Sequence, residues 1–549
     1  MNANADVIVE IRDLDIALPA GADRPLAVRN LSVELRQNEI LCVVGESGSG
    51  KSLLAGAIMG LLPAGVHVAG GSIRYDGHEL STLDEAGFRS IRGRRIAMIF
   101  QEPMTALNPV LTVHEQIDEV LQAHGMTERA KRQQRILELL EATGLPDPAS
   151  LQHAYPFRLS GGQRQRVMIA MALALQPDVL IADEPTTALD VTTQKQILAL
   201  LREVQQRSNL AVLFITHDFG VVADIATRVA VMQHGELVEY GGARDVLDRP
   251  QHPYTQRLID AVRGLSREPL APHEASTATV LDVANATKTY ITRVSLFSSQ
   301  MREVHALKNV NLKLEHGETV GLVGESGSGK STLGQVVVQL LKADAGVIRF
   351  NGEDLSTMNR KRFAEVRPRI QMIFQDPYAS LNPRHKIGRV LTESQVLHGA
   401  TKQEALKRAE RMLEMVSLDR SALGRFPHEF SGGQRQRIGI ARALVMEPQL
   451  IVADEPVSAL DVSIQAQVLD LLLELRRKLK LSMLFITHDL RVAAQLCDRI
   501  AVMRKGEIVE LGASESVLRN PQHDYTKLLL HSMPGHDWLA GAGTKASAT

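Results

Sequence analysis

The sequence predicts two tandem α/β domains, because its two halves carry the same short motifs in the same order. The octapeptide GESGSGKS stands at 45–52 and again at 324–331. Each copy follows a short apolar run, Ile40–Val44 or Thr319–Val323, and precedes a helix-forming segment, which is the strand–loop–helix order of an α/β unit. A repeat of this length indicates a duplicated domain, since each half is as long as a whole domain.

Four further motifs follow each octapeptide. They are IFQEP or IFQDP, LSGGQ or FSGGQ, LIADEP or IVADEP, and ITHD in both halves. The last three motifs all recur at one constant separation, whereas the two octapeptides lie slightly further apart than that. Small deletions therefore separate the early parts of the two halves, and the later parts keep one register.

Short apolar runs late in each half predict parallel strands that helices cover on both faces. They lie at 179–182, 212–216 and 229–232, with counterparts at 450–453, 483–487 and 500–503. Between the glutamine motif and LSGGQ, apolar residues recur at helical spacing at 128–143 and 402–416, so we expect an inserted helical subdomain. Its basic residues, including Arg129, Lys131 and Arg132, are interpreted as a solvated face.

These patterns divide the chain into a first domain at 1–263, a linker at 264–279, a second domain at 280–534 and a flexible tail at 535–549. The linker sequence, GLSREPLAPHEASTAT, has the proline, serine and threonine content of a connecting segment. The tail ends in small residues, GAGTKASAT, and is expected to fray.

The composition is that of a soluble globular protein, with 44% apolar and 23% charged residues. No run reaches the roughly 18 apolar residues of a membrane helix, and the start, MNANADVIVE, lacks the features of a signal peptide, so we expect a cytoplasmic protein. A formal charge of −1 gives no global attraction for nucleic acid. The two cysteines, Cys42 and Cys497, are too few for zinc or an iron–sulfur cluster, and neither is expected.

The glycine-rich octapeptides predict phosphate-binding loops. Glycines let backbone N–H groups turn toward a phosphate chain, and the following helix adds the positive end of its dipole. Lys51 and Lys330 would reach the β- and γ-phosphates, and Ser52 and Ser331 would offer a hydroxyl to Mg²⁺. The predicted loop residues are Gly45, Ser47, Gly48, Gly50, Lys51 and Ser52 in the first half and Gly324, Ser326, Gly327, Gly329, Lys330, Ser331 and Thr332 in the second.

Adjacent carboxylates end one apolar strand in each half. Asp183 and Asp454 can reach the Mg²⁺ shell, and Glu184 and Glu455 can accept the proton of an attacking water. By itself such a pair could simply solvate a loop, just as the histidine of ITHD could be an ordinary polar cap. Because His217 and His488 follow their glutamates at the same spacing in both halves, we interpret all four residues as catalytic.

The LSGGQ motif precedes a helix and so builds a second anion-binding N-terminus, which its own glycine loop does not require. At this point the chain resembles the ATP-binding cassette (ABC) family over essentially its full length, with Walker A, Q-loop, signature, Walker B, D-loop (TALD, SALD) and H-loop motifs in order. The resemblance implies two P-loop NTPase domains, each with a RecA-like core, an antiparallel β subdomain and an inserted helical subdomain. It also implies that two ATP molecules lie between the glycine loop of one half and the signature of the other.

The resemblance adds further residues to both predicted sites. The nucleotide contacts it implies are Gln101, Ser160, Gly161, Gly162, Gln163 and Asp190, and Gln375, Ser431, Gly432, Gly433, Gln434 and Asp461. Gln101 and Gln375 would sense the γ-phosphate, and would join Ser52, Asp183, Ser331 and Asp454 around Mg²⁺. Because both halves keep the lysine, glutamate, histidine and signature glycines, we expect both sites to hydrolyse ATP.

One difference between the halves concerns the base of the nucleotide. Tyr290 stands where the family places an aromatic ring against adenine, and alignment of VIVEIRDLDIAL with VLDVANATKTYI puts Ala17 opposite it. Loss of a stacking ring, worth roughly 1–2 kcal/mol by analogy with other base–aromatic contacts, would weaken the first site. The two sites are therefore expected to differ in affinity.

The segments RPQHPYTQRLI and NPQHDYTKLLL, at 249–259 and 520–530, are similar to the His-Pro-Tyr extension of bacterial oligopeptide, dipeptide and nickel importer ATPases. As a fused double cassette, the chain most resembles ATPases of microcin C and oligopeptide-type importers. The resemblance implies two separate membrane permeases, an external substrate-binding protein, one fused chain per transporter and a place on the cytoplasmic face of the inner membrane. Peptide, antibiotic peptide, glutathione and nickel stay open as cargo.

The alternative is a soluble double-cassette ATPase, such as a ribosome-associated translation factor. That class normally carries a long, highly charged helical linker, whereas the linker here is short and contains proline. A DNA-repair cassette would bring zinc cysteines and interrupting insertions. A protein with inactive sites conflicts with the presence of Glu184 and Glu455.

Overall fold

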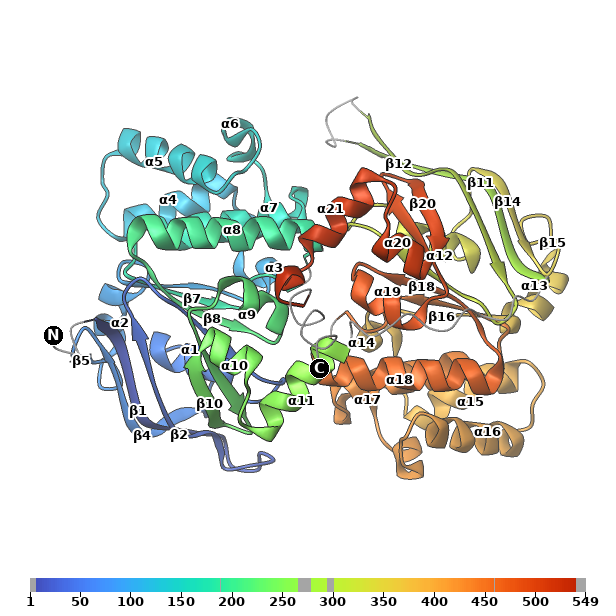
Figure 1. Cartoon of the computed structure of the whole chain (residues 1–549), viewed down its shortest axis with the longest axis horizontal. Helices are drawn as coiled ribbons and strands as arrows, with labels where there is room; N and C mark the ends of the chain where they lie inside the picture. The colour runs from blue at the N-terminus through green and yellow to red at the C-terminus, as the bar shows by residue number, and fades with distance from the viewer. Residues whose placement is uncertain (1–5, 188, 265–277, 294–300, 459, 540–549) are drawn as a thin grey trace, which may run out of the picture. The chain divides into compact units, whose positions relative to one another are not determined.

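The computed structural model describes residues 6–187, 189–264, 278–293, 301–458 and 460–539. The chain forms two compact units, shown from blue to green and from yellow to red in Figure 1. The first unit comprises residues 1–262 together with 533–549, and the second comprises residues 263–532. Each unit contains one four-stranded and one six-stranded sheet.

The six-stranded sheet of the first unit has the order β10-β9-β3-β8-β7-β6. Its strands pair in parallel except for β10, which runs antiparallel to β9. Every residue of the central strands β3, β7 and β8 is buried, as expected where helices cover both faces. The strands are β3 (Ile40–Val44), β6 (Ile96–Ile99), β7 (Val179–Asp183), β8 (Ala211–Thr216), β9 (Arg228–Gln233) and β10 (Glu236–Gly242).

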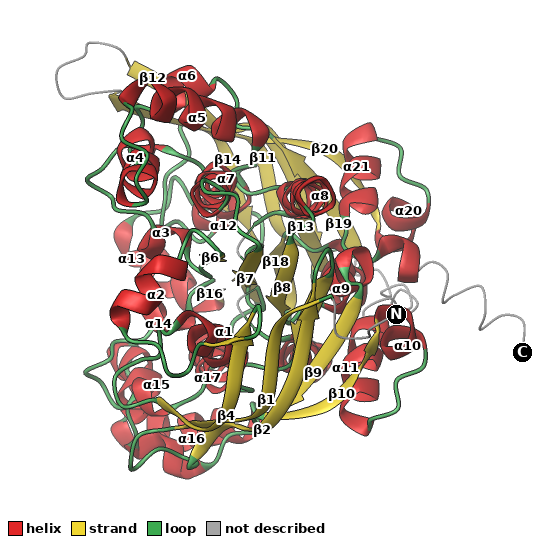
Figure 2. Ribbon diagram, turned by 90° about the vertical axis from the view of Figure 1, so that its left-hand side faces the viewer, coloured by secondary structure: helices red, strands yellow, loops and turns green. Residues whose placement is uncertain are grey.

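The helices of this core follow the strands. Figure 2 shows the strands in yellow, with red helices beside them. The helix α1 (Lys51–Met59) starts directly after the glycine loop, and α8 (Val191–Ser208) and α9 (Phe219–Ile225) follow β7 and β8. The remaining core helices are α10 (Ala243–Asp248) and α11 (Pro253–Gly264), together with the short α2 (Glu85–Ile91) and α3 (Pro103–Ala106).

An antiparallel sheet covers α1 on its other side. Its order is β2-β1-β4-β5, formed by β1 (Val7–Ala17), β2 (Leu26–Arg36), β4 (His67–Tyr75) and β5 (His78–Glu79). Buried side chains of β1 and β2 join those of α1, β3 and β8 in one hydrophobic cluster. The glycine loop is thereby anchored between two sheets.

The inserted helical subdomain lies where its sequence pattern predicted it. It contains α4 (Val113–Ala123), α5 (Arg129–Ala142), α6 (Pro148–Leu151) and α7 (Gly161–Ala172). The helices α4 and α7 both begin with a capping box, made by Thr112 with Glu115 and by Ser160 with Gln163. Arg132 is not on a solvated face as expected: it is buried and paired with Asp118 at 2.6 Å, because it links α5 to α4.

The second unit repeats this architecture. Its sheets have the orders β12-β11-β14-β15 and β16-β17-β18-β13-β19-β20. The strands are β11 (Thr279–Arg293), β12 (Met301–Glu315), β13 (Thr319–Val323), β14 (Ala345–Phe350), β15 (Glu353–Asp354), β16 (Ile370–Ile373), β17 (Leu450–Asp454), β18 (Ser482–Thr487), β19 (Arg499–Arg504) and β20 (Glu507–Ala513). The helices are α12 (Lys330–Val337), α13 (Arg360–Val366), α14 (Pro377–Ser380), α15 (Ile387–Leu397), α16 (Lys402–Met415), α17 (Gly432–Leu444), α18 (Val462–Leu479), α19 (Leu490–Leu496), α20 (Ser514–Arg519) and α21 (Asp524–Ser532).

The ends of the expected domains differ in detail from the sequence boundaries. Of the expected linker, 265–277 lies outside the described residues, and β11 begins at Thr279. Of the expected tail, residues 535–539 form part of a helical turn that belongs to the first unit, and 540–549 lie outside the described residues.

The packing of α17 on α18 gives a stability prediction. A Cβ added at Gly433 would lie 2.6 Å from Cγ2 of Ile464, whereas one added at the neighbouring Gly432 meets nothing within 4 Å. We expect Gly433→Ala to destabilise the second unit by about 1–3 kcal/mol through overpacking, with Gly432→Ala close to neutral. Thermal unfolding followed by circular dichroism would measure both, and equal midpoints for the two variants would contradict the prediction.

Candidate functional site

The first glycine loop connects β3 to α1 and has a conformation that only glycine tolerates. Gly45 has φ +153°, and a Cβ there would lie 2.2 Å from the carbonyl oxygen of Met232. The ammonium of Lys51 is buried and donates to the carbonyl oxygens of Gly45 at 2.7 Å and Glu46 at 2.9 Å. The loop therefore holds a positive charge beside the N-terminus of α1, where anions bind favourably.

The carboxylates at the end of β7 lie beside this loop. Asp183 accepts a hydrogen bond from Ser52 Oγ at 3.2 Å, which joins two of the predicted Mg²⁺ ligands. Glu184 accepts from Gln101 Nε2 at 2.8 Å and from Thr187 Oγ1 at 3.0 Å. The parallel sheet thus brings three separate sequence motifs to one edge.

A histidine completes the first carboxylate cluster. His217 Nδ1 lies 3.1 Å from Glu184 Oε1, and its ring comes from the end of β8, next to β7 in the sheet. Glu184 has a left-handed backbone conformation, with φ +46°, and Glu455 has φ +44°. Such conformations are uncommon for a residue with a Cβ and often occur at functional sites.

The electrostatics of the two carboxylates differ although they are neighbours. Burial raises the pKa of Asp183, and the hydrogen bond from Ser52 only partly opposes this. Burial also acts to raise the pKa of Glu184, but hydrogen bonds from His217 and Thr187 and the charge of Lys51 hold that pKa below its usual value. Glu184 is therefore ionised at neutral pH, as a proton acceptor requires.

The second unit repeats the cluster in nearly the same geometry. Lys330 donates to the carbonyl oxygens of Gly324 and Glu325, both at 2.8 Å. Ser331 Oγ lies 3.0 Å from Asp454. Glu455 accepts from Gln375 at 3.1 Å and lies 3.3 Å from His488 Nδ1.

The titration of the second cluster follows the same physics. Burial raises the pKa of Asp454. The pKa of Glu455 is lowered, because His488 and Lys330 outweigh its burial. Burial acts to lower the pKa of His488, yet the partner carboxylate Glu455 raises it overall. Protonated His488 and ionised Glu455 stabilise one another.

Two tyrosines support the glycine loops and were not identified as site residues from the sequence. The hydroxyl of Tyr254 accepts from the backbone N–H of Glu46 at 3.0 Å, and that of Tyr525 accepts from Glu325 N–H at 3.1 Å. Both belong to the His-Pro-Tyr segments, which the sequence analysis used only as a family marker. The recurrence of these segments in register with the other late motifs was the available signal.

The signature residues lie at the start of α7 and α17. Ser160 and Ser431 cap these helices, and each forms a capping box with Gln163 or Gln434. Asp190 caps α8 by accepting from Thr193 N–H at 2.9 Å. The residues around the first glycine-loop cavity include Gln101 and Glu184 but none of 160–163. Within its own unit, the signature therefore does not line that cavity.

The strand register beside the first cavity corrects one expectation. The cavity has a volume of about 530 Å³, and Leu18 and Arg24 contribute to its lining. A Cβ added at Gly50 would contact the carbonyl oxygen of Ala27, and one added at Gly329 would contact that of Ala306, so these two alanines are equivalent. The residues that follow the alanines, Val28 and Leu307, pair with Ile16 and Lys288, respectively.

This register places Leu18, and not Ala17, at the position equivalent to Tyr290. The expected alignment was wrong by one residue: it put buried Val9 opposite Asp282, whereas the structural register puts Val9 opposite Leu281 and Ile11 opposite Val283, all of them buried. The first site still presents no ring at this position. Tyr290 itself is partly exposed on β11, with 37% of its surface accessible.

Two further findings concern the described residues, namely metal-binding groups and membrane-spanning helices. No group of three or more histidine, cysteine, aspartate or glutamate side chains in this part of the chain could hold a metal ion. Among the same residues, no helix has both the length and the apolar character that crossing a bilayer requires.

Comparisons with known proteins agree with this geometry. The family model of the ABC transporter matches residues 28–187 and 307–458. A second model, the C-terminal region of oligopeptide/dipeptide transporters, matches residues 238–290 and 509–547, which include both His-Pro-Tyr segments.

Curated relatives match almost the whole chain. The peptidoglycan transport ATP-binding protein YejF of Agrobacterium fabrum is 46% identical over 532 residues, covering 96% of each chain. The glutathione import ATP-binding protein GsiA of Escherichia coli K12 is 46% identical over 565 residues, covering 97% of this chain and 90% of that protein. With two complete sets of Walker, Q-loop, signature and H-loop residues and these matches, the chain belongs to the ABC transporter family and is a double-cassette ATPase.

Proposed function

We propose that this protein is the ATP-hydrolysing subunit of a bacterial importer of peptides or peptide-like substrates. The observation that carries the proposal is that both units hold an ionised glutamate between a glutamine and a histidine, beside a lysine-bearing glycine loop. The match to the oligopeptide/dipeptide transporter region and the import names of the relatives support the substrate class.

In each site the chain's own residues would divide the work of hydrolysis. The glycine loop and Lys51 or Lys330 would bind the phosphates, because the first loop and its lysine line one cavity and the second loop holds its lysine in the same way. Glu184 or Glu455 would accept the proton of the attacking water, and His217 or His488 would orient that carboxylate. Gln101 and Gln375, which touch the same carboxylates, would sense the γ-phosphate.

The oxygen donors beside each lysine fit Mg²⁺. Ser52 Oγ and Asp183, like Ser331 Oγ and Asp454, are hard oxygen ligands within 3.2 Å of one another, and the side-chain amides of Gln101 and Gln375 donate to the neighbouring Glu184 and Glu455. When bound, Mg²⁺ would neutralise charge on the phosphates. The raised pKa of Asp183 and Asp454 is a cost of burial that a cation would remove.

The signature helices would each complete the ATP site of the other unit. Ser160 and Ser431 leave the N-terminus of a helix of twelve or more residues available to an anion, and the signature lies outside the first glycine-loop cavity. ATP binding would then bring the units together, and hydrolysis would release them.

We place this subunit on the cytoplasmic face of the inner membrane, with two separate permeases and an external substrate-binding protein as partners. Affinity purification of the tagged chain from gently solubilised native cells, with mass spectrometry of the co-purifying proteins, tests this assignment. We expect two multi-helix membrane proteins in about one-to-one ratio. Ribosomal proteins in their place would overturn it in favour of a translation factor.

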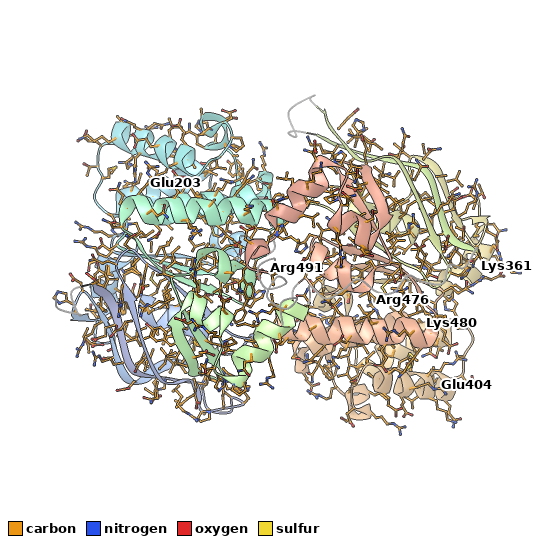
Figure 3. The ribbon with its side chains drawn as sticks, viewed as in Figure 1. Glu203, Lys361, Glu404, Arg476, Lys480 and Arg491 are labelled. Carbon is orange, nitrogen blue, oxygen red and sulfur yellow. The ribbon has the colours of Figure 1, made fainter. Side chains whose placement is uncertain are left out.

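Replacement of the proposed proton acceptors tests the chemistry. We expect Glu184→Gln combined with Glu455→Gln to lower ATP hydrolysis by about 10²–10⁴-fold, because the amide cannot accept a proton, while ATP binding persists. Phosphate release and equilibrium nucleotide binding measure the two effects. Glu203→Gln on the exposed face of α8, labelled in Figure 3, is the matched control and is expected to retain full activity.

The base end of the cavity predicts an affinity difference between the sites. We expect Leu18→Tyr to tighten ATP binding at the first site by about 5–30-fold and Tyr290→Leu to weaken the second by a similar factor, as stacking energies of about 1–2 kcal/mol imply. Binding isotherms of the hydrolysis-deficient double variant would resolve the two sites. If Leu18→Tyr leaves ATP affinity unchanged, Leu18 does not face the base.

A further inference from the structure

Residues 533–539 lie on a surface of the first unit. Residues 533–539 follow the last helix of the second unit, yet they belong to the first compact unit. Pro534 and Gly535 are buried. Their backbone lies directly against Gly220 on α9, where an added Cβ would be 2.5 Å from the carbonyl oxygen of Pro534. Only glycine at position 220 allows this approach.

Polar contacts extend the interface on both sides of Gly220. The backbone N–H of Gly535 donates to the carboxylate of Asp224, whose pKa burial raises to about 6. The indole N–H of Trp538 donates to Asp248, at the end of α10, at 3.1 Å. The segment also closes its own helical turn, from Leu539 N–H to the carbonyl of Gly535 at 2.9 Å. It is therefore an ordered element fitted to α9 and α10.

The second unit does not have these three contact residues. In the register set by the ITHD motifs of the two halves, Arg491, Gln495 and Arg519 stand in place of Gly220, Asp224 and Asp248. Arg491, labelled in Figure 3, folds back onto Asp489 with an Nη2–Oδ2 distance of 2.8 Å. Arg519 pairs with Glu515 at 3.2 Å.

The helix caps next to this surface are nevertheless the same in both units. Asp218 accepts from Gly220 N–H at 2.8 Å, and Asp489 accepts from Arg491 N–H at 2.8 Å. The helix cap thus has the same geometry in both units. The three residues that contact residues 533–539 in the first unit are replaced by other residues in the second.

We propose that Gly220, Asp224 and Asp248 form a dedicated docking surface for residues 533–539, and that the docked segment fixes α9 and thereby positions His217. The helix α9 begins two residues after His217, and its cap Asp218 is the residue between them. A segment pressed against Gly220 in the first turn of α9 restrains the chain that carries the histidine. This second half of the proposal rests on the proposed function of His217.

Tryptophan fluorescence tests docking without reference to activity, because Trp538 is the single tryptophan of the chain. We expect Gly220→Arg, which introduces the side chain of the second unit, to displace the segment, with a red-shifted emission and roughly two-fold or greater acrylamide quenching. Gly424→Arg, at an exposed glycine with nothing within 4 Å of an added Cβ, is the matched control and should leave emission unchanged.

A milder pair of variants covers the case in which Gly220→Arg does not fold. Asp224→Ala and Asp248→Ala each remove one contact, and together they are expected to produce the same change in Trp538 quenching with an unaltered circular dichroism spectrum. If Trp538 emission and quenching stay at their original values in the folded variants, the docking surface is wrong.

Hydrogen exchange tests the effect on α9. When the chain is shortened so that it ends at Ser532, we expect the amides of α9 to exchange at least about 10-fold faster than in the unshortened chain, whereas those of α19 keep their rates. Docking shown by fluorescence with unchanged α9 exchange would overturn the positioning role and leave the surface. If the amides of α9 exchange faster in the shortened chain but ATP hydrolysis is unchanged, the docking surface stands and the proposed function of His217 is wrong.

Discussion

The parallel pairing of β7 with β8 and of β8 with β3 is the constraint on which the first site depends. It puts the carboxyl ends of three strands at one edge, so the glycine loop, Glu184 and His217 meet although they are far apart in sequence. The second unit repeats the constraint through β17, β18 and β13. Because the sheet places a histidine and a lysine beside each glutamate, the pKa of that glutamate stays below its usual value in spite of its burial.

Much of this could be predicted from the sequence because the strands are short and apolar on both faces. The expected run Ile40–Val44 is β3 itself, and the expected ends of β7 and β8 differ from the structure by one residue. The pairs Ser52–Asp183 and Glu184–His217 follow once these strands are adjacent. Motif spacing contains this information, since each chemical group stands at the end of a strand or at the start of a helix.

Other features depend on contacts that no local pattern encodes. The hydroxyl of Tyr254 reaches Glu46 across 208 residues, so its role under the glycine loop appears only in three dimensions. The helical spacing of its neighbours predicts that Arg132 is exposed. It is buried because it forms an ion pair with Asp118 on the neighbouring helix.

The two units therefore share the residues proposed to act on ATP and differ around them, and the position of residues 533–539 on the first unit has a consequence for biosynthesis. A ribosome makes the first unit's sheets and helices early, but residues 533–539 leave it after all of the second unit. The backbone of Gly220 then lacks its partner for most of translation. The first unit is therefore translated before the second unit but acquires residues 533–539 only after it, so the proposed docking at Gly220 follows synthesis of the second unit.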